Sequence, residues 1–483
     1  MCVDRNRDRD HTVVDVTDAT SAAETTASWR VLFGPRYVAT ATLLAGGVGL
    51  YAVNEFLTIS LMPSTVADIG GERLYAWVTT LYLVGSVIAA STVYSVLLRV
   101  GARVSYLLGL AVFGVGTLVC AVAPSMEVLL AGRTLQGAAG GLLAGLGYAV
   151  INAVLPPSLW ARASALTAAM YAVATVIGPV TGGLFAQFDV WRWAFGSMVM
   201  ATAALALLVP AVLTADTVAR RGVTAVTKVP LWSLLVLGVA VLSVSVAGIP
   251  HNVFATAGLL AAGGLLVGIL LIFEWRIRAA MLPPSTFGSG PLKWTYLAMA
   301  LLMAAAMVES YVPLFGHRLA HLTPVVAGLL GAALALGWTV SEIVSASLNN
   351  GRVVARLVAA APVVMAVGLA LAAITQRDNA PIGIVAFWAL ALVVTGIGIG
   401  VPWPHLSAWA MHCVDDPAEG GAAAAAINTV QLISGAFGAG LAGVVVNTAG
   451  GGEAMAARWL FAVFMVLAAF GAMASYRATR GQF

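Results

Sequence analysis

The stretch "VATATLLAGGVGLYAVNEFLTISLM" (residues 38–62) contains one ionisable side chain, Glu55, and is otherwise apolar or weakly polar. The hydrocarbon core of a bilayer is about 30 Å thick, and an α-helix needs roughly 20 apolar residues to cross it. The stretch therefore predicts a membrane-spanning helix. Because a carboxylate is expensive to place inside a bilayer, Glu55 is a candidate functional group.

The composition extends this reading to the whole chain. Of 483 residues, 61% are hydrophobic and 9% are charged, and the mean hydropathy is +0.96. These values indicate an all-α polytopic membrane protein. Further apolar stretches predict about fourteen spans in total. They lie near 38–62, 75–98, 104–123, 127–153, 163–187, 191–213, 230–248, 254–274, 294–316, 324–347, 353–374, 381–403, 421–447 and 457–476.

The distribution of basic residues predicts the orientation. If the N-terminus is cytoplasmic, the inside segments carry 18 Arg and Lys residues and the outside segments carry 5. Cytoplasmic loops hold the excess of basic residues, so both termini are expected inside. Residues 1–36 lack apolar periodicity and a cleavable signal, and they predict a disordered tail. The net charge of +4 thus reflects topology and does not suggest nucleic-acid binding.

Two long polar interruptions divide the chain. They lie at 214–230 and 274–293 and bracket two apolar stretches. This arrangement predicts two six-helix halves related as a parallel repeat, with a substrate site between them near the midplane. The expected units are a cytoplasmic tail (1–36), an N-terminal six-helix bundle (37–213), cytoplasmic loops with two additional spans (214–293), a C-terminal six-helix bundle (294–476) and a cytoplasmic tail (477–483).

A second acid supports the repeat. Glu309, in "AAAMVESYVPLFG" (304–316), lies in the first span of the second half, as Glu55 does in the first half. Both are expected roughly 10 Å below the outer boundary. Desolvation raises the pKa of a carboxyl group and a nearby arginine lowers it, so such groups suit proton or substrate-cation binding. The alternative is a neutral carboxyl group that stabilises helix packing, for Glu55 with Asn54 or Thr58 as partner.

Several motifs resemble the major facilitator superfamily, and most closely its fourteen-helix drug:proton antiporter branch. "GRTLQGAAGG" (132–141) is similar to that family's RxxQG motif. "ATVIGPVTGG" (174–183) resembles the antiporter motif GxxxGPxxGG, with Ala174 at its first position. "WRWAFG" (191–196) and the Gly/Ala-rich segment 420–448 also match the branch. The resemblance implies a major-facilitator fold of two six-helix bundles plus two extra spans.

The resemblance also implies roles for the motif residues. Arg133 would pair with Glu55 or Glu309 and be released when one is protonated, unless it forms a fixed structural ion pair. Gln136, three residues on, faces the same side and would orient Arg133. The remaining motif positions would act in conformational change, through close helix packing and a proline kink. They are Gly137, Gly178, Pro179, Gly182 and Gly183.

The segment between the second and third spans departs from the family pattern GxxxDRxGRR. In "YSVLLRVGARV" (94–104), Arg99, Gly101 and Arg103 match it. Leu98 replaces the Asp and Tyr94 replaces the leading Gly. The charge network that latches the cytoplasmic side in the family is therefore expected to be missing or differently built.

Three residues of the second half are further candidates. Glu342, in "GWTVSEIVSAS" (337–347), would bind a proton or substrate, or would pair with a loop residue such as Arg352. Trp403 and His405, in "VPWPHLSAW" (401–409), would line the cavity next to a proline hinge, or would be an interfacial Trp with an incidental His. Asn54, next to Glu55, is also a possible cavity-lining residue.

These observations predict a proton-coupled exporter of small amphipathic compounds in a bacterial plasma membrane. The bacterial source is suggested by 22 Arg against 2 Lys. The expected partners are a small-molecule substrate, protons and the lipid bilayer, and the protein is expected to be a monomer. A dedicated exporter or importer of one metabolite, lipid or siderophore, and a membrane sensor, remain alternatives. No catalytic set, ATP-binding loop, cofactor motif or metal-ligand spacing is visible, so we expect neither an enzyme nor a cofactor.

Overall fold

A computed structural model describes residues 29–480 except 91, 156, 214–230, 249–252, 278–281, 289, 349 and 414–419. Most of the predicted N-terminal tail (1–28), the predicted loop 214–230 and the last residues of the C-terminal tail (481–483) lie outside the described residues. The described secondary structure is helical throughout. The last part of the predicted tail contains the short helix α2 (Trp29–Leu32), in which Leu32 is buried.

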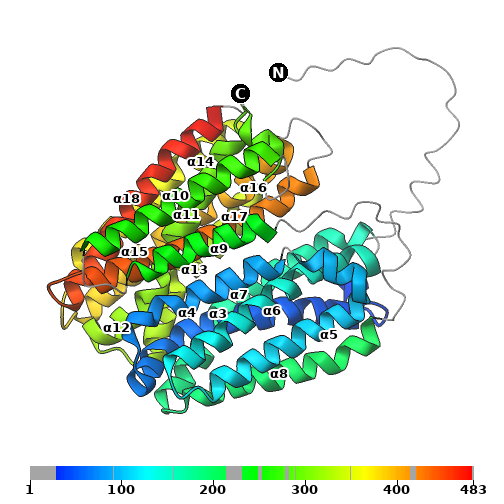
Figure 1. Ribbon diagram of the computed structural model, residues 1–483, viewed down its shortest axis with the longest axis horizontal. Coiled ribbons are helices and arrows are strands. Elements are labelled where there is room, and N and C mark those ends of the chain that lie inside the picture. Colours follow the sequence, from blue (N-terminus) through cyan, green and yellow to red (C-terminus); the bar gives the residue numbers. More distant parts are fainter. Residues whose placement is uncertain are drawn as a thin grey trace, which may run out of the picture.

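The helices follow the apolar stretches of the sequence (Figure 1). The first half contains α3 (Val38–Ile69), η1 (Glu72–Leu74), α4 (Tyr75–Ala90), α5 (Val93–Ala121), α6 (Met126–Val154), α7 (Pro157–Gln187) and α8 (Trp191–Val212). Next come α9 (Leu231–Val246), α10 (Val253–Ile277) and η2 (Pro284–Phe287). The second half contains α11 (Leu292–Ala306), η3 (Met307–Tyr311), α12 (Val312–Ala320), α13 (Pro324–Ala346), α14 (Gly351–Thr375), α15 (Ile382–Gly400), α16 (Trp403–His412), α17 (Gly420–Thr448) and α18 (Glu453–Arg480).

The number of spans differs from the prediction. Among the described residues, 12 helical segments are long and apolar enough to cross a membrane, and fourteen spans are not confirmed. Helix α6 is not among the 12, and polar residues such as Arg133 and Gln136 dilute its apolar content. The apolar part of α9 is short, at Leu235–Val246.

Two predicted spans are interrupted. The first span of the second half consists of α11, the 3₁₀ segment η3 and α12. The span predicted at 381–403 ends as α15 at Gly400, and α16 begins at Trp403 after Pro402. A proline lacks the N–H that continues the helical ladder, which explains the second break. Helix α5 is kinked at Gly101, whose φ of 77° favours glycine.

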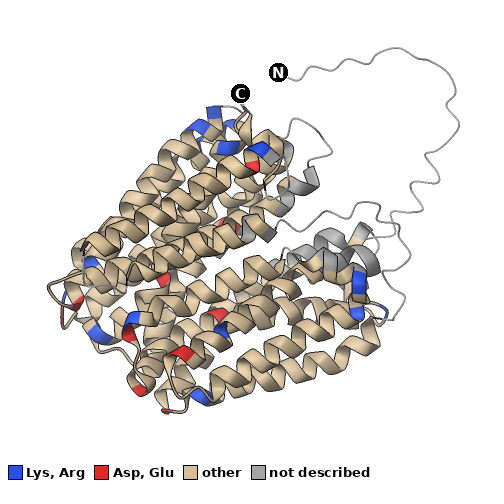
Figure 2. Cartoon of the chain, viewed as in Figure 1, with Lys and Arg blue, Asp and Glu red and all other residues tan. Residues whose placement is uncertain are grey.

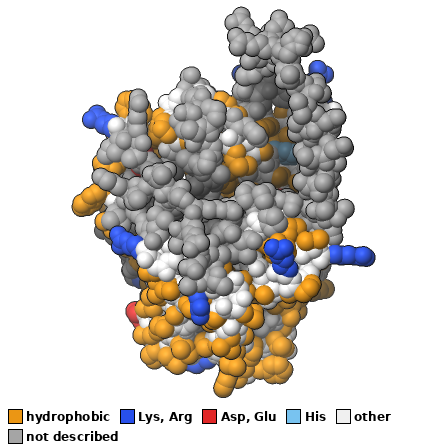
Figure 3. Space-filling model, turned by 90° about the vertical axis from the view of Figure 1, so that its right-hand side faces the viewer, with side chains coloured by type: hydrophobic (Ala, Val, Ile, Leu, Met, Phe, Trp, Pro, Cys, Tyr) orange, Lys and Arg blue, Asp and Glu red, His pale blue; other side chains and the backbone are white. Residues whose placement is uncertain are grey.

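The outer surface is apolar, as a lipid-facing surface requires. Large side chains such as Leu207 in α8 and Phe254 in α10 are more than four-fifths exposed, at 82% and 87%. In Figure 3, hydrophobic side chains gather over the lower part of the visible face. Charged residues lie mainly near the ends of the bundles, with few between (Figure 2). This distribution fits a protein whose flanks face hydrocarbon.

The two bundles of Figure 1 contact each other near one end. There, Gly183 of α7 lies against Val325 of α13, and Gly443 of α17 lies against Ala76 of α4. The Asn447 side chain donates to the Arg73 carbonyl oxygen at 2.9 Å. These contacts join the ends of α7 and α17 to the beginnings of α13 and α4. The ribbons of the two bundles spread apart toward the opposite end.

Matching glycine contacts relate the two halves. A Cβ atom on Gly137 of α6 would collide with the Tyr82 carbonyl oxygen of α4. A Cβ atom on Gly396 of α15 would collide in the same way with the Leu334 carbonyl oxygen of α13. Helices α4 and α6 thus approach each other as α13 and α15 do. Small residues permit such close backbone contact.

We predict that Gly137→Ala destabilises the protein by about 1–3 kcal/mol, because α4 and α6 must separate to accept the methyl group. The matched control is Gly264→Ala in α10, where a Cβ atom meets nothing within 4 Å. It is expected to leave stability unchanged or raise it by at most about 1 kcal/mol. Thermal unfolding of the purified variants checks this, and equal melting temperatures would show that the α4–α6 contact is not tight.

Candidate functional site

Arg133 is held inside the first half, with only 1% of its surface exposed. Its Nη1 donates to Gln136 Oε1 at 2.9 Å, and its Nε donates to the Val78 carbonyl oxygen at 3.4 Å. The guanidinium carbon lies 4.1 Å from the centre of the Tyr82 ring. The cation is therefore stabilised by dipoles and an aromatic face.

Gln136 connects Arg133 to two further helices. Its Nε2 donates to Asn54 Oδ1 of α3 at 3.2 Å and to Thr117 Oγ1 of α5 at 2.9 Å. Gln136, Asn54 and Thr117 are each fully buried. Asn54 Nδ2 has no hydrogen-bond partner among the described residues. The network fixes Arg133 relative to α3, which carries Glu55.

Arg133 forms no ion pair with the two acids. The described ion pairs are Arg192–Asp68, Arg318–Glu72 and Arg318–Glu453. The geometric link between Arg133 and Glu55 is the hydrogen bond of Gln136 to Asn54, the residue before Glu55, at 3.2 Å. The side chain of Glu55 is partly buried.

Glu309 lies on the facing side, in the 3₁₀ segment η3. It is 8% exposed, and its Oε2 has no hydrogen-bond partner among the described residues. A 3₁₀ segment in mid-helix often marks a functional hinge. Phe56, which follows Glu55 on α3, lines the same pocket as Glu309. The structure thus places the two predicted acids at the same part of the boundary between the halves, and we call them the Glu55–Glu309 unit.

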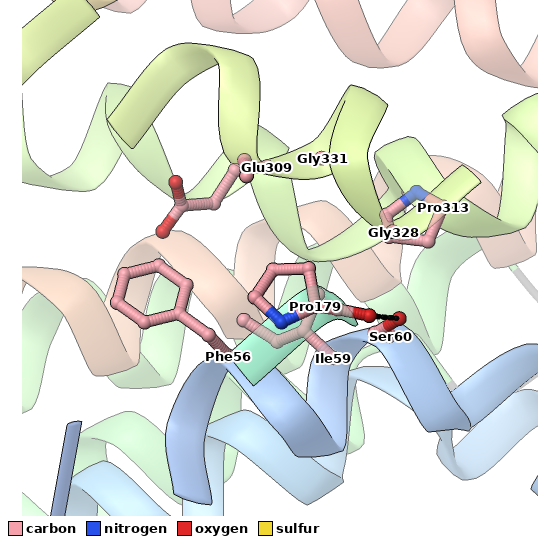
Figure 4. A pocket seen from close by; sticks show the side chains of 9 residues that line it. Phe56, Ile59, Ser60, Pro179, Glu309, Pro313, Gly328 and Gly331 are labelled. Carbon is pink, nitrogen blue, oxygen red and sulfur yellow. Dashed lines mark hydrogen bonds between the residues drawn. The ribbon is translucent and has the colours of Figure 1, made fainter. Parts of the chain in front are cut away.

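A small pocket opens beside Glu309 (Figure 4). Its cavity volume is about 10 Å³, which is room for about one water molecule and far below the roughly 300–1,000 Å³ that holds drug-sized ligands. Helices of both halves contribute to its wall. The lining residues are Phe56, Ile59, Ser60, Pro179, Glu309, Pro313, Gly328, Gly331 and Ala332.

The glycine-rich motif of α7 packs against both halves at this pocket. Gly178 and Gly182 lie on the backbone of α3, where added Cβ atoms would be 2.6 Å from Phe56 Cβ and from the Leu57 carbonyl oxygen. Gly183 lies on the opposite side against Val325 of α13. Ser60 Oγ donates to the Pro179 carbonyl oxygen at 3.2 Å. The motif is therefore the place where α7 joins the first half to the second.

Of the second-half candidates, Glu342 lies further along α13, and Trp403 and His405 lie on α16 beside it. The Trp403 ring is 5.5 Å from that of Trp338, in an edge-to-face arrangement. His405 Nε2 lies 3.0 Å from Ser345 Oγ. Glu342 is partly buried and has no ion pair with Arg352 among the described pairs. Trp338 and Ser345 were not singled out by the sequence, although both lie in the quoted segment around Glu342.

The loop-motif residues lie away from this region. Arg99 is exposed, Arg103 is partly buried, and Gly101 forms the kink in α5. The Leu98 side chain lies outside the described part of the structure. No group of three or more His, Cys, Asp or Glu side chains gathers as a metal site in the described residues.

An ion-pair cluster missed by the sequence analysis crosses between the halves. Arg318, near the end of α12, lies 2.5 Å from Glu72 Oε1 of the first half and 2.6 Å from Glu453 Oε1 of the second. The rings of Tyr75 and Tyr311 stand 4.8 Å apart at the same junction. Residues at separate helix ends carry no periodic signal, so the sequence could not pair them. We call Glu72, Arg318 and Glu453 the outer clamp.

We predict that Arg133→Lys impairs function although it keeps the charge. A lysine ammonium cannot donate to Gln136 and lie flat on Tyr82 as the planar guanidinium does. The variant should express and fold, and transport should fall by about tenfold or more, because misplacing a buried cation costs more than about 1 kcal/mol. Transport by the purified variant in vesicles measures this. Wild-type transport would reduce Arg133 to a packing residue.

Comparison with known proteins agrees with this architecture. Residues 44–439 match the family model described as Major Facilitator Superfamily. A probable multidrug-efflux transporter of Mycobacterium tuberculosis is 67% identical over 463 residues, which cover 95% of this chain and 98% of the relative. Multidrug resistance protein 3 of Bacillus subtilis is 30% identical over 150 residues, covering 31% of this chain and 29% of that protein.

Solved structures show the same fold at low sequence identity. A point mutant of the nucleoside transporter NupG has a TM-score of 0.63 at 12% identity, covering 91% of this chain and 99% of its own. A POT family transporter in complex with 5-aminolevulinic acid has a TM-score of 0.65 at 11% identity, covering 89% and 95%. From its family match, its close relative and its fold, the chain belongs to the major facilitator superfamily.

Proposed function

We propose that the protein is a proton-coupled exporter of small amphipathic drugs in a bacterial plasma membrane. The observation that carries the proposal is Glu309, a buried acid with an unpartnered oxygen beside a pocket between the halves. The close relative named as a probable multidrug-efflux transporter supports the substrate class. The alternative is that the protein uses the same site to export one dedicated metabolite.

The topology that we propose has fourteen spans and both termini in the cytoplasm. Helices α6 and α9 complete the count beyond the 12 segments that qualify by length and hydropathy. Helices α3–α8 form the first bundle, α11–α18 form the second, and α9 and α10 are the added pair. Helix α9 packs against α4 and α17, at one edge of the junction between the bundles.

This orientation assigns a conformation to the structure. The contacts of Gly183 with Val325 and of Arg318 with Glu72 then lie on the outer side. The halves are in contact there, and we infer a conformation that is closed to the outside, as an exporter that is ready to accept an internal substrate requires. When the protein opens to the outside, these contacts must break. The glycine-rich motif of α7 must then shift relative to α3 and α13.

In the proposed mechanism, Glu55 and Glu309 bind and release the coupled protons. Arg133 supplies a nearby positive charge, and Gln136 holds Arg133 in place. If the two acids lie close enough at this pocket, ionisation of one disfavours ionisation of the other, because like charges repel. A cationic or polar substrate that enters near Glu309 favours the ionised form and so releases a proton. External protons would then displace the substrate after the cavity opens outward. Substrate and proton thereby exchange across the membrane.

We predict that Glu55→Gln abolishes uphill export driven by a pH gradient while the protein still folds. The amide keeps the size and hydrogen-bonding capacity of the side chain but cannot alternate between charge states. Glu309→Gln should lose part or all of the same flux. Flux in vesicles with an imposed pH gradient checks both variants, and the exposed Glu127→Gln serves as control. Full pH-driven flux in both site variants would contradict proton coupling at these acids.

We further predict that Glu72→Gln favours the outward-open state by up to about fivefold, because an exposed ion pair contributes about 0–1 kcal/mol. Asp68→Asn is the matched control, since it removes the 2.5 Å pair with Arg192 inside one half. Spin labels at the exposed positions Phe188 and Ile382 would report the outer distance between the halves. An equal distance distribution in wild type and Glu72→Gln would show that the outer clamp does not bias the conformation.

A further inference from the structure

A second small pocket lies inside the second half, away from the Glu55–Glu309 unit. Helices α12, α13, α14, α15 and α18 contribute to its wall. Most of the wall is apolar, with Phe315 of α12, Leu330 of α13, Leu392 of α15 and Phe461 of α18 among the lining residues. All of the lining residues are buried. A polar group in this wall is therefore shielded from bulk solvent.

Two polar side chains interrupt the apolar wall. Gln376 follows the last residue of α14 and is 2% exposed, and Trp388 of α15 is 3% exposed. Gln376 Oε1 and Trp388 Nε1 both lack a hydrogen-bond partner among the described residues. Buried polar atoms without a partner are rare in proteins, because such an atom has lost its hydration and gained nothing in return. Two of them in one pocket point to a shared ligand.

The orientation of the glutamine amide is fixed by its other hydrogen bond. Gln376 Nε2 donates to the Ala372 carbonyl oxygen at 3.1 Å. Turning the amide over would place Oε1 against that carbonyl oxygen, and two acceptors repel each other. Oε1 is therefore the atom left without a partner, and it can only accept, whereas the indole Nε1–H of Trp388 can only donate. The pocket thus offers one acceptor and one donor that are not bonded to each other.

Size and chemistry together restrict what can bind between these atoms. The cavity volume is about 10 Å³, close to the least that one water molecule needs, so organic molecules are excluded. A metal cation would find a single side-chain oxygen where it requires several, and the indole N–H would repel it. An anion would face the negative end of the amide dipole. A water molecule both donates and accepts, and it matches the two groups.

We infer that Gln376 and Trp388 bind one water molecule inside the second half. The water oxygen accepts from Trp388 Nε1, and one water hydrogen is donated to Gln376 Oε1. The Gln376 carbonyl oxygen also accepts from Arg458 Nε of α18 at 2.9 Å. The water therefore completes a polar junction that joins the end of α14 to α15 and α18. This inference is independent of the proposed export function.

A structure of the purified full chain in lipid nanodiscs, at a resolution that shows ordered water, tests the site directly. One density peak should lie within about 3.2 Å of both Trp388 Nε1 and Gln376 Oε1. A pocket without such a peak, in a map that shows other ordered waters, would overturn the inference. A direct hydrogen bond between the two side chains would overturn it as well.

A double-mutant cycle tests the bridge in solution. Trp388→Phe removes the donor and Gln376→Met removes the acceptor, and both keep most of the apolar contact. Each change should lower the melting temperature of the purified protein. Because either change breaks the same bridge, the double variant should lose less than the sum of the two single losses, by about 1–3 °C. Additive losses would show that no water joins the two side chains.

The control cycle pairs Trp388→Phe with Leu330→Val. Leu330 lines the same pocket and offers no polar side-chain atom, so this pair measures coupling through the shape of the pocket alone. The departure from additivity should be smaller in the control pair than in the Trp388–Gln376 pair. Equal departures in the two cycles would reject the shared water molecule.

Discussion

A charged side chain inside a membrane protein must be compensated where it lies, because neither hydrocarbon nor packed helices can solvate it. Arg133 meets this constraint with a glutamine, a carbonyl oxygen and a tyrosine ring. No carboxylate among the described ion pairs neutralises it. We propose that its positive charge acts on Glu55, so that a proton on Glu55 changes the electrostatic balance of the site. In this proposal, the ionisation of the two acids depends on their position relative to Arg133, and therefore on the conformation of the protein.

We propose that packing at the junction of the halves converts this balance into movement. The α7 motif has backbone contact with α3 on one side and with α13 on the other, so it cannot move relative to one half without shearing against the other. Glu309 lies in an irregular 3₁₀ segment next to that junction. We therefore expect a change of charge at Glu309 to change the backbone conformation of this 3₁₀ segment between α11 and α12. The outer clamp adds a modest bias toward closure at the outer end.

Much of the fold followed from the sequence, because hydrocarbon permits little besides helices. The stretch 38–62 and its counterparts located nearly all helices, and the resemblance predicted the family. The count of fourteen spans was not confirmed, since α6 carries Arg133 and Gln136 and α9 is short. The irregular segment at Glu309 was missed, whereas the prolines around Trp403 had predicted the break that follows Gly400. Hydropathy averages over a window and does not detect a few residues of 3₁₀ or proline-broken structure.

The site was predictable to a smaller extent. Glu55 and Glu309 were singled out because an acid in an apolar stretch is conspicuous, and their shared role stays a prediction. The partners of Arg133 on α4 were not found, since Val78 and Tyr82 are ordinary residues of another helix. The outer clamp depends on three helix ends that are distant in sequence. Contacts of this kind follow from tertiary packing and leave no local pattern.

The central claim is that substrate and protons compete for the Glu55–Glu309 unit. The most direct measurement is the proton release of the purified protein in weak buffer when a transported drug is added at near-neutral pH. The account predicts release of about one proton per bound substrate in wild type, because the bound substrate favours the ionised acids, and none in the double variant Glu55→Gln, Glu309→Gln. Binding of the drug to wild type without proton release, or undiminished release by the double variant, would contradict it.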